Sequence, residues 1–291
     1  MANCLRRDLR QVLSAGKVLL VDGGIGSSLR ALDTPKDAHS YLDRLNLTHP
    51  SAVAEVHRAF ISAGVDIITT NTFQANELRC PDGYTVEELN KAAVCIAKQA
   101  IRDHVKNDDK NIYILGSVGP LCTGNVDDAK KHYTTQIETL LDAGVDGLLI
   151  ETITHTSEAR VALEIARELQ VDIPVIASIC LVKDGILPGG ESCMEGIEVL
   201  NTLAIDAIGI NCVDDMDLLV QAITRMKSTM PSLPVYTCPN AGFPDEHGKY
   251  SLTCTTYRDI VHTLHKLGVR IIGGCCGVAA RHLESIDRDA C

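Results

Sequence analysis

Eight short runs of apolar and β-branched residues recur along this chain and alternate with segments of helical periodicity. The runs are Lys17–Asp22, Val65–Asn71, Ile112–Ser117, Val145–Glu151, Pro174–Ile179, Ala207–Asn211, Pro234–Cys238 and Val269–Gly273. In segment 51–64, for example, Val53, Val56 and Phe60 share one helical face before a C-terminal glycine. Because such alternation through eight strands closes a parallel sheet on itself, we predict an α/β fold, a (β/α)8 TIM barrel. A doubly wound open sheet is the alternative.

No Pro/Ser-rich linker interrupts the alternation, so we expect a single domain over residues 1–291. The net charge of -11 argues against a nucleic-acid partner, which would require a basic face. No apolar run approaches the roughly 18 to 20 residues of a membrane span, and the N-terminus lacks a signal-like apolar core. With 12 cysteines in a chain too long to need a disulfide framework, we expect a cytoplasmic protein with reduced thiols and no membrane partner.

Polar residues follow several of the predicted strands at the ends that carry the active site in a barrel of this kind. Asp22 and Gly23 follow the first strand, Thr72 the second and Asn240 the seventh, and Glu151 ends the fourth. We expect these residues to converge on one rim. Glu151 ends an apolar run, so its carboxylate should face the barrel mouth, where a substrate ammonium would offset the cost of burying an unpaired charge. A structural hydrogen bond to a neighbouring loop is the alternative for Glu151.

Three cysteines close two of the predicted strands, Cys212 after the sixth and the pair Cys275 and Cys276 after the eighth. Neighbouring side chains on a regular strand point to opposite faces, so the pair can face one point only where the backbone curls. The flanking Gly274 and Gly277 permit such a curl. Three thiolates leave the fourth position of a tetrahedral Zn²⁺ open, so we predict a catalytic zinc site, with buried structural thiols as the alternative.

The ligand type indicates the chemistry. Three thiolates make zinc a poor activator of water, but a substrate thiol in the fourth position would lose its proton near neutral pH and remain nucleophilic. We therefore predict alkylation of a zinc-activated thiol, with Cys212, Cys275 and Cys276 as both metal ligands and catalytic residues.

With these motifs the chain resembles the homocysteine S-methyltransferase domain family, and is most similar to the homocysteine-binding module of cobalamin-dependent methionine synthase. The motifs are Asp22-Gly-Gly-Ile-Gly, Thr70-Asn-Thr-Phe73, Gly-Ser-Val-Gly-Pro120, Ile-Glu151-Thr, Gly209-Ile-Asn-Cys212 and Gly273-Gly-Cys-Cys-Gly277. The resemblance implies zinc-dependent methyl transfer to L-homocysteine giving L-methionine. It also implies that Asp22, Gly23 and Glu151 hold the amino-acid end of homocysteine, with Thr72 nearby. We add Asn240 as a candidate for the substrate site, where it or water would occupy the fourth zinc position before homocysteine binds.

The methyl donor is the least constrained part of this interpretation. Segment 239–250 resembles methionine synthase, whose folate and cobalamin modules are absent from this sequence, so we expect a methyl-corrinoid on a separate protein. S-methylmethionine or a betaine-like donor is the alternative, although a chain with no Trp, 3 Phe and 7 Tyr has few rings for a cation-binding cage. Selenohomocysteine could replace homocysteine as acceptor. A non-catalytic zinc-binding or thiol-binding barrel would not need Glu151 on the same rim.

Overall fold

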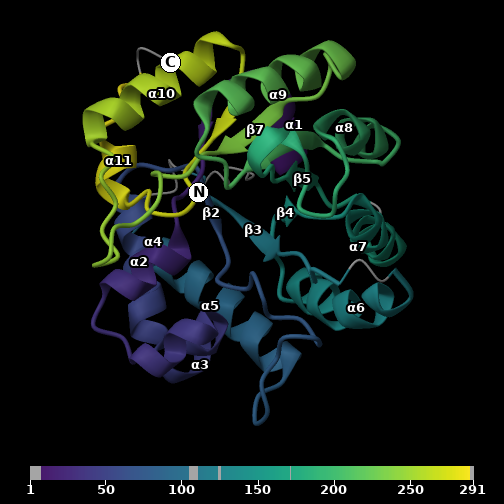
Figure 1. The fold of residues 1–291 in the computed structure, drawn as a ribbon. Helices are drawn as coiled ribbons and strands as arrows, with labels where there is room; N and C mark the ends of the chain where they lie inside the picture. The colour runs from purple at the N-terminus through teal and green to yellow at the C-terminus, as the bar shows by residue number, and fades with distance from the viewer. Residues whose placement is uncertain (1–7, 105–110, 124–125, 171, 289–291) are drawn as a thin grey trace, which may run out of the picture.

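Eight parallel strands form the centre of the structure, and helices surround them (Figure 1). The computed structural model describes residues 8–104, 111–123, 126–170 and 172–288. The strands are β1 (Leu19–Leu20), β2 (Ile67–Thr69), β3 (Tyr113–Val118), β4 (Gly147–Ile153), β5 (Val175–Ile179), β6 (Ala207–Asn211), β7 (Val235–Cys238) and β8 (Ile271–Ile272). Each lies within or overlaps one of the eight predicted runs.

The sheet closes on itself. Its strands follow the order β1-β8-β7-β6-β5-β4-β3-β2, and every neighbouring pair is parallel. A bridge between Val21 and Ile67 joins β1 to β2, and the Asp66 N–H donates to the Leu20 carbonyl at 2.8 Å. The prediction of a (β/α)8 TIM barrel is therefore confirmed, and the open-sheet alternative is wrong.

Three aspartates fix the register at the N-terminal ends of the strands. Asp66, Asp146 and Asp206 each stand just before an even-numbered strand. Their carboxylates accept backbone N–H groups from the preceding odd-numbered strands, at Leu20 (2.9 Å), Ile114 (2.8 Å) and Val175 (2.9 Å). A short polar side chain thus replaces a ladder hydrogen bond where regular pairing stops. The repeated Ala-Gly-Val-Asp of the sequence, at 63–66 and 143–146, contains the first two of these aspartates.

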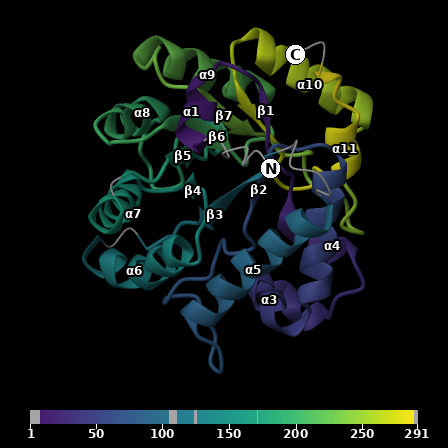
Figure 2. The same ribbon diagram turned by 180° about the vertical axis from the view of Figure 1, so that it is seen from behind.

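The helices pack around the barrel (Figure 2), and their buried apolar residues form one core cluster with those of the strands. They are α2 (Ile25–Ala31), α3 (Leu45–Thr48), α4 (Pro50–Ser62), α5 (Val86–His104), α6 (Val126–Asp142), α7 (Thr156–Leu169), α8 (Cys193–Asn201), α9 (Met216–Thr229), α10 (Cys254–Lys266) and α11 (Ala280–Glu284). Short 3-10 helices lie at η1 (Lys36–Ser40), η2 (Leu42–Arg44) and η3 (Lys183–Gly185). As predicted, Val53, Val56 and Phe60 of α4 are buried.

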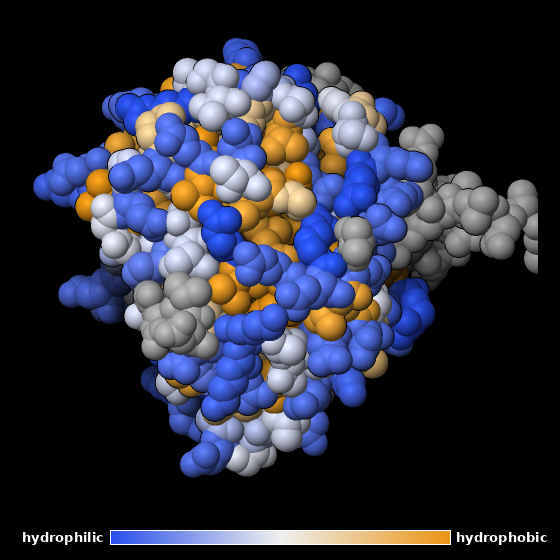
Figure 3. Space-filling view, turned by 90° about the vertical axis from the view of Figure 1, so that its right-hand side faces the viewer, coloured by the Kyte–Doolittle hydropathy of each residue, from blue (hydrophilic) through white to orange (hydrophobic). Residues whose placement is uncertain are grey.

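The surface on the side of α6 to α8 is mostly hydrophilic, with apolar side chains gathered in a band near its centre (Figure 3). Within the described ranges, no helix is both long and apolar enough to cross a membrane.

Helix α1 (Leu9–Ser14) covers the N-terminal end of the barrel. Leu9 and Leu13 are buried in a cluster with inward-facing strand residues such as Ile67 and Leu149. Arg10 Nε donates to Asp206 Oδ1 at 2.6 Å, which ties the helix to the start of β6. The opposite, C-terminal end of the barrel is thereby left as the accessible one.

Replacing Leu13 with Ala should lower the free energy of unfolding by about 2 to 5 kcal/mol, because this side chain is 3% exposed and fills the end of the barrel. Urea denaturation measures the change. Gln11→Ala on the exposed face of the same helix is the matched control and should change stability by less than about 0.5 kcal/mol. Equal effects of the two substitutions would contradict the packing of α1.

Candidate metal and substrate site

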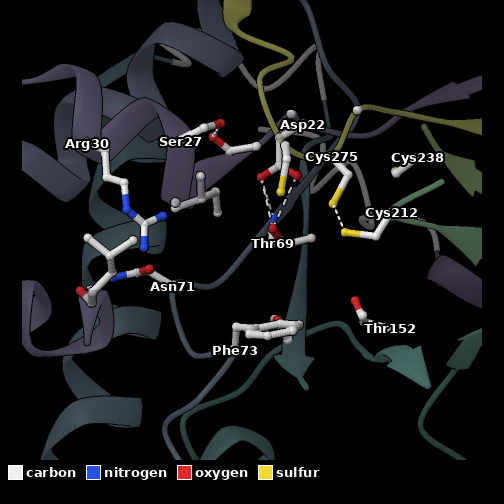
Figure 4. A pocket seen from close by; sticks show the side chains of 18 of the residues that line it. Asp22, Ser27, Arg30, Thr69, Asn71, Phe73, Thr152, Cys212, Cys238 and Cys275 are labelled. Atoms are coloured by element: carbon white, nitrogen blue, oxygen red, sulfur yellow. Dashed lines mark hydrogen bonds between the residues drawn. The ribbon is translucent and has the colours of Figure 1, made fainter. Parts of the chain in front are cut away.

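A cavity of about 760 Å³ opens at the C-terminal ends of the strands (Figure 4). Its walls come from the segments that follow most of the strands, so residues distant in sequence meet there. The lining includes Asp22, Gly23, Arg30, Asp43, Thr69, Asn71, Phe73, Ser117, Glu151, Thr152, Cys212, Tyr236, Tyr250, Cys275 and Cys276. The convergence expected of a barrel rim is therefore observed for Asp22, Gly23, Glu151 and the three cysteines.

The three predicted ligands lie together. The Sγ atoms of Cys212, Cys275 and Cys276 are all within 4.8 Å of one another, and those of Cys212 and Cys275 are 2.6 Å apart. Cys212 has a left-handed backbone (φ 57°), and its N–H donates to the Cys238 carbonyl at 3.1 Å. Gly277 (φ 83°) turns the chain after the vicinal pair. These curled strand ends allow both neighbouring cysteines to contribute a thiol to one point.

The cluster fits a metal ion of zinc's size and softness. Three sulfurs bound at about 2.3 Å to one zinc would lie about 3.8 Å apart, within the range of spacings in this cluster. Hydrogen bonds from Cys212 and Cys275 lower the pKa of Cys276 to about 3. In return, the hydrogen bonds that Cys275 makes to Cys212 and Cys276 raise its pKa well above the ordinary value. Hydrogen bonds within the cluster thus favour ionisation of Cys276 over its two neighbours, and a divalent cation would supply the charge needed to ionise all three thiols.

Glu151 lies where a bulge interrupts β4. The register with β5 shifts between Ile150 and Ile153, and Thr152 has φ 56°. This bulge aims Glu151 into the cavity, as bulges beside active sites commonly do. Its Oε1 accepts the Ser117 hydroxyl at 2.5 Å, yet burial raises the pKa of Glu151 to about 7.

Asp22 provides a second carboxylate on the same cavity. It is 2% exposed, and its Oδ2 accepts the Thr69 N–H at 2.7 Å. Burial raises the pKa of Asp22 well above its usual range, and the nearby Glu151 raises it further. Two carboxylates in this state would be stabilised by a ligand ammonium.

Gly23 lies on the cavity wall at a position where a side chain would not fit. A Cβ there would be 2.2 Å from the Val278 carbonyl oxygen and 2.8 Å from the Phe60 ring. The glycine is required because the loop after β1 packs directly against the loop after β8.

Thr72 and Asn240 do not line the cavity. Thr72 is fully buried behind the wall, where its hydroxyl donates to the Ser117 carbonyl at 2.7 Å. Asn240 Oδ1 accepts the Cys276 N–H at 3.1 Å, so its side chain supports the vicinal pair. The structure therefore places both residues one layer behind the cavity surface, and their predicted contact with substrate stays a prediction.

Asn211, at the end of β6, connects this strand to Glu151 and Thr152 of β4. The sequence did not predict this role. Asn211 Oδ1 accepts the Thr152 N–H at 2.9 Å and the Ser178 hydroxyl at 2.7 Å. Its Nδ2 donates to the Thr152 hydroxyl at 2.8 Å and lies 3.5 Å from Glu151 Oε2. The amide thus holds the bulged Glu151–Thr152 peptide. Its position in Gly209-Ile-Asn-Cys212 was the available signal, but the motif was interpreted only for its cysteine.

The structure combines a (β/α)8 barrel with a cluster of three thiols at the C-terminal ends of its strands, as expected for an α/β barrel enzyme with a thiol-ligated metal site. A family model described as homocysteine S-methyltransferase matches residues 19–290. The chain belongs to the homocysteine S-methyltransferase family. The resemblance proposed from the motifs and the enzyme class are therefore confirmed.

Two curated relatives are methionine synthases. The chain is 28% identical over 300 residues to methionine synthase from Mycobacterium tuberculosis (strain ATCC 25618 / H37Rv) and 26% identical to that from Mycobacterium leprae (strain TN). Each alignment covers 96% of this chain and 25% of the relative. The chain thus spans about a quarter of the length of these relatives.

Solved structures of homocysteine methyltransferase MmuM from Escherichia coli have the same fold. The metallated form aligns with a TM-score of 0.81 at 22% identity, and the oxidised form with 0.82 at 23%. Both alignments cover 96% of this chain and 98% of that one.

Replacing Asn211 with Ala should destabilise the protein by about 1 to 3 kcal/mol, because the buried Ser178 hydroxyl and the Thr152 N–H would lose their acceptor. Urea unfolding measures this change. Asn201→Ala, at the exposed end of α8, is the control and should be nearly neutral. An Asn211→Ala variant as stable as the control would show that water replaces the amide.

Proposed function

We propose that this chain transfers a methyl group to the thiol of L-homocysteine, giving L-methionine, on a zinc ion held by Cys212, Cys275 and Cys276. The observation that most directly supports this proposal is that three thiols from two strand ends lie within 4.8 Å of one another beside two buried carboxylates. Membership of the homocysteine S-methyltransferase family supports homocysteine as the acceptor. We further propose that residues 1–291 form one homocysteine-binding barrel domain.

Zinc, when bound, would supply an open position at which a substrate thiol loses its proton near neutral pH and remains nucleophilic. The protein's own residues would orient the substrate. Glu151 and Asp22 would receive the ammonium, since both line the cavity and none of the ion pairs found among the described residues includes either carboxylate. Gly23 keeps the loop after β1 close to the loop that carries the vicinal cysteines.

The donor proposed from the sequence is a methyl-corrinoid carried by another protein, with S-methylmethionine as the alternative. Pro244, His247, Gly248, Lys249 and Tyr250 line the cavity, so the segment on which the corrinoid hypothesis depends lies at the cavity. This placement supports a role for that segment in donor contact, and either donor would meet it.

Replacing any one of Cys212, Cys275 and Cys276 with Ala should remove most bound zinc and nearly all methyl transfer, because two thiolates cannot hold an exchangeable ion. Zinc content per chain and methionine formation are measured on each purified variant. Cys238→Ala is the matched control, because this buried thiol also lines the cavity but lies outside the cluster. The Cys238→Ala variant should retain zinc. Full zinc occupancy in all three cluster variants would rule out the site.

Replacing Glu151 with Gln should weaken homocysteine binding by about 1.5 to 3 kcal/mol, as expected for a charged hydrogen bond, with zinc content unchanged. Because the pKa of Glu151 is about 7, the number of protons released on homocysteine binding should also depend on pH. Below this pKa, Glu151 is mostly protonated and must release a proton to pair with the ammonium. Well above it, the carboxylate is already ionised.

Calorimetry in buffers of different ionisation enthalpy measures the protons released on homocysteine binding. The wild type should release more protons than Glu151→Gln about one pH unit below the pKa of Glu151, and the two should agree about two units above it. The thiol proton contributes equally to both proteins. Identical proton release at the lower pH would assign Glu151 a structural role only.

A further inference from the structure

Residues 273–279, which we call the cysteine loop, carry the vicinal thiols and have an acceptor for every backbone N–H. The acceptors, all at 2.9 to 3.1 Å, are the Thr237 carbonyl for Gly273, the Asp22 carbonyl for Gly274, the Pro239 carbonyl for Cys275, Asn240 Oδ1 for Cys276, Ser27 Oγ for Gly277, the Cys275 carbonyl for Val278 and His282 Nδ1 for Ala279. One of these seven bonds lies within the loop, and the other six come from elsewhere in the fold. The surrounding elements therefore determine the conformation of the cysteine loop.

Tyr257, on α10, holds the first residue of the cysteine loop. Its hydroxyl donates to the Gly273 carbonyl at 2.8 Å. The side chain is 0% exposed, and a hydroxyl at this depth is costly to bury without a partner. The hydrogen bond to Gly273 thus satisfies the hydroxyl and fixes the point at which the cysteine loop leaves β8.

His282, on α11, holds the last residue of the same loop. Its Nδ1 accepts the Ala279 N–H at 2.9 Å, and its Nε2 lies 3.1 Å from the Leu252 carbonyl. A backbone N–H only donates and a carbonyl only accepts, so these partners select the neutral ring with the proton on Nε2. Burial lowers the pKa of His282, which favours the same neutral form.

The two side chains form one buried pair behind the cysteine loop. Helices α10 and α11 lie side by side (Figure 1), and the rings of Tyr257 and His282 are in contact, with centroids 5.7 Å apart and planes inclined by 60°. Neither residue lines the cavity. Tyr257 and His282 therefore hold both ends of the cysteine loop without touching the space that a substrate would occupy.

The pair also fixes the segment that covers the loop. The His282 bond to the Leu252 carbonyl holds the chain two residues after Tyr250. The ring of Tyr250 lies directly against Gly277, where a Cβ would be 2.2 Å from the Tyr250 Cδ1 atom. The curl after the vicinal thiols is thus enclosed between Tyr250 and the buried pair.

We propose that Tyr257 and His282 are positioning residues for the zinc site, which hold the cysteine loop so that Cys275 and Cys276 face Cys212 before the metal binds. Neighbouring residues on a regular strand point to opposite faces, so the vicinal thiols meet only while the loop stays curled. Loosening either end should therefore lower the affinity for zinc. This inference rests on the proposed function.

Replacing Tyr257 with Phe removes the hydroxyl and keeps the ring. Zinc affinity, measured by competition with a chelator, should fall by about tenfold or more, as for other groups that orient metal ligands without binding the metal. Tyr133→Phe is the matched control, because the Tyr133 hydroxyl is as deeply buried and donates to the Gly119 carbonyl at 3.1 Å, in the loop after β3. The control should lose comparable stability to urea and bind zinc as the wild type does.

Two substitutions of His282 separate positioning from packing. His282→Leu removes both hydrogen bonds, whereas His282→Asn keeps an oxygen acceptor for the Ala279 N–H at the place of Nδ1. His282→Leu should weaken zinc binding by about tenfold or more, and His282→Asn should restore most of the affinity. A role in packing alone would give no such rescue. Tyr257→Phe decides the test if His282→Leu does not fold.

Hydrogen exchange of the metal-free proteins tests the pair without zinc. The amides of residues 273–279 should exchange about tenfold faster in Tyr257→Phe than in the wild type, which corresponds to the loss of one hydrogen bond. The amides of β4 should exchange at the same rate in both. Tyr133→Phe should leave the exchange of residues 273–279 unchanged.

Unchanged zinc affinity in Tyr257→Phe would overturn the assignment, and so would an equal loss of zinc affinity in Tyr133→Phe. Failure of the proposed function has a different result, which is the absence of zinc binding to the wild type. Hydrogen exchange would then still decide whether Tyr257 and His282 hold the cysteine loop, and unchanged exchange in Tyr257→Phe would show that they do not.

Discussion

The closure of the barrel between β1 and β2 is the constraint on which the site depends. The Val21–Ile67 bridge and the hydrogen bond from Asp66 to Leu20 complete the ring of parallel strands. Because all eight strands run in the same direction, their C-terminal ends meet at one edge. Residues 22, 151, 212 and 275 reach the same edge of the barrel for this reason. An open sheet would spread the same residues along a line.

Uncompensated negative charge is the common property of this cavity. Burial raises the pKa values of Asp22, Asp43 and Glu151 together, and three thiols share a space that favours one thiolate. Each feature costs free energy in the isolated protein and is relieved by a cation. A metal ion at the thiols and ammonium groups at the carboxylates would be complementary to the same cavity. The site is thus organised for cationic ligands at the expense of stability.

The backbone around the site is held in conformations that regular strands do not adopt. Cys212 and Thr152 are non-glycine residues with φ near +57°, and both lie at strand ends that line the cavity. Such conformations cost about 1 to 3 kcal/mol each and persist only when surrounding contacts impose them. Here Asn211 imposes one of them, because its amide bonds both the backbone and the side chain of Thr152. The ligand strand and the carboxylate strand are therefore fixed as one unit.

The sequence alone determined the number and order of strands, the meeting of the three thiols at one edge and the approach of Glu151 to the cavity. Continuous apolar runs and 3.6-residue periodicity indicate which residues are buried, and parallel topology then places the strand ends. The tertiary structure alone decided which side chains face inward at those ends. Thr72 and Asn240 lie behind the cavity wall, whereas Asp43 and Arg30 line the cavity. Loop conformation decides these orientations, and it depends on hydrogen-bond partners such as Ser117 and Gln74, 45 and 31 positions away. No local pattern encodes such partners, so only the folded chain could assign them.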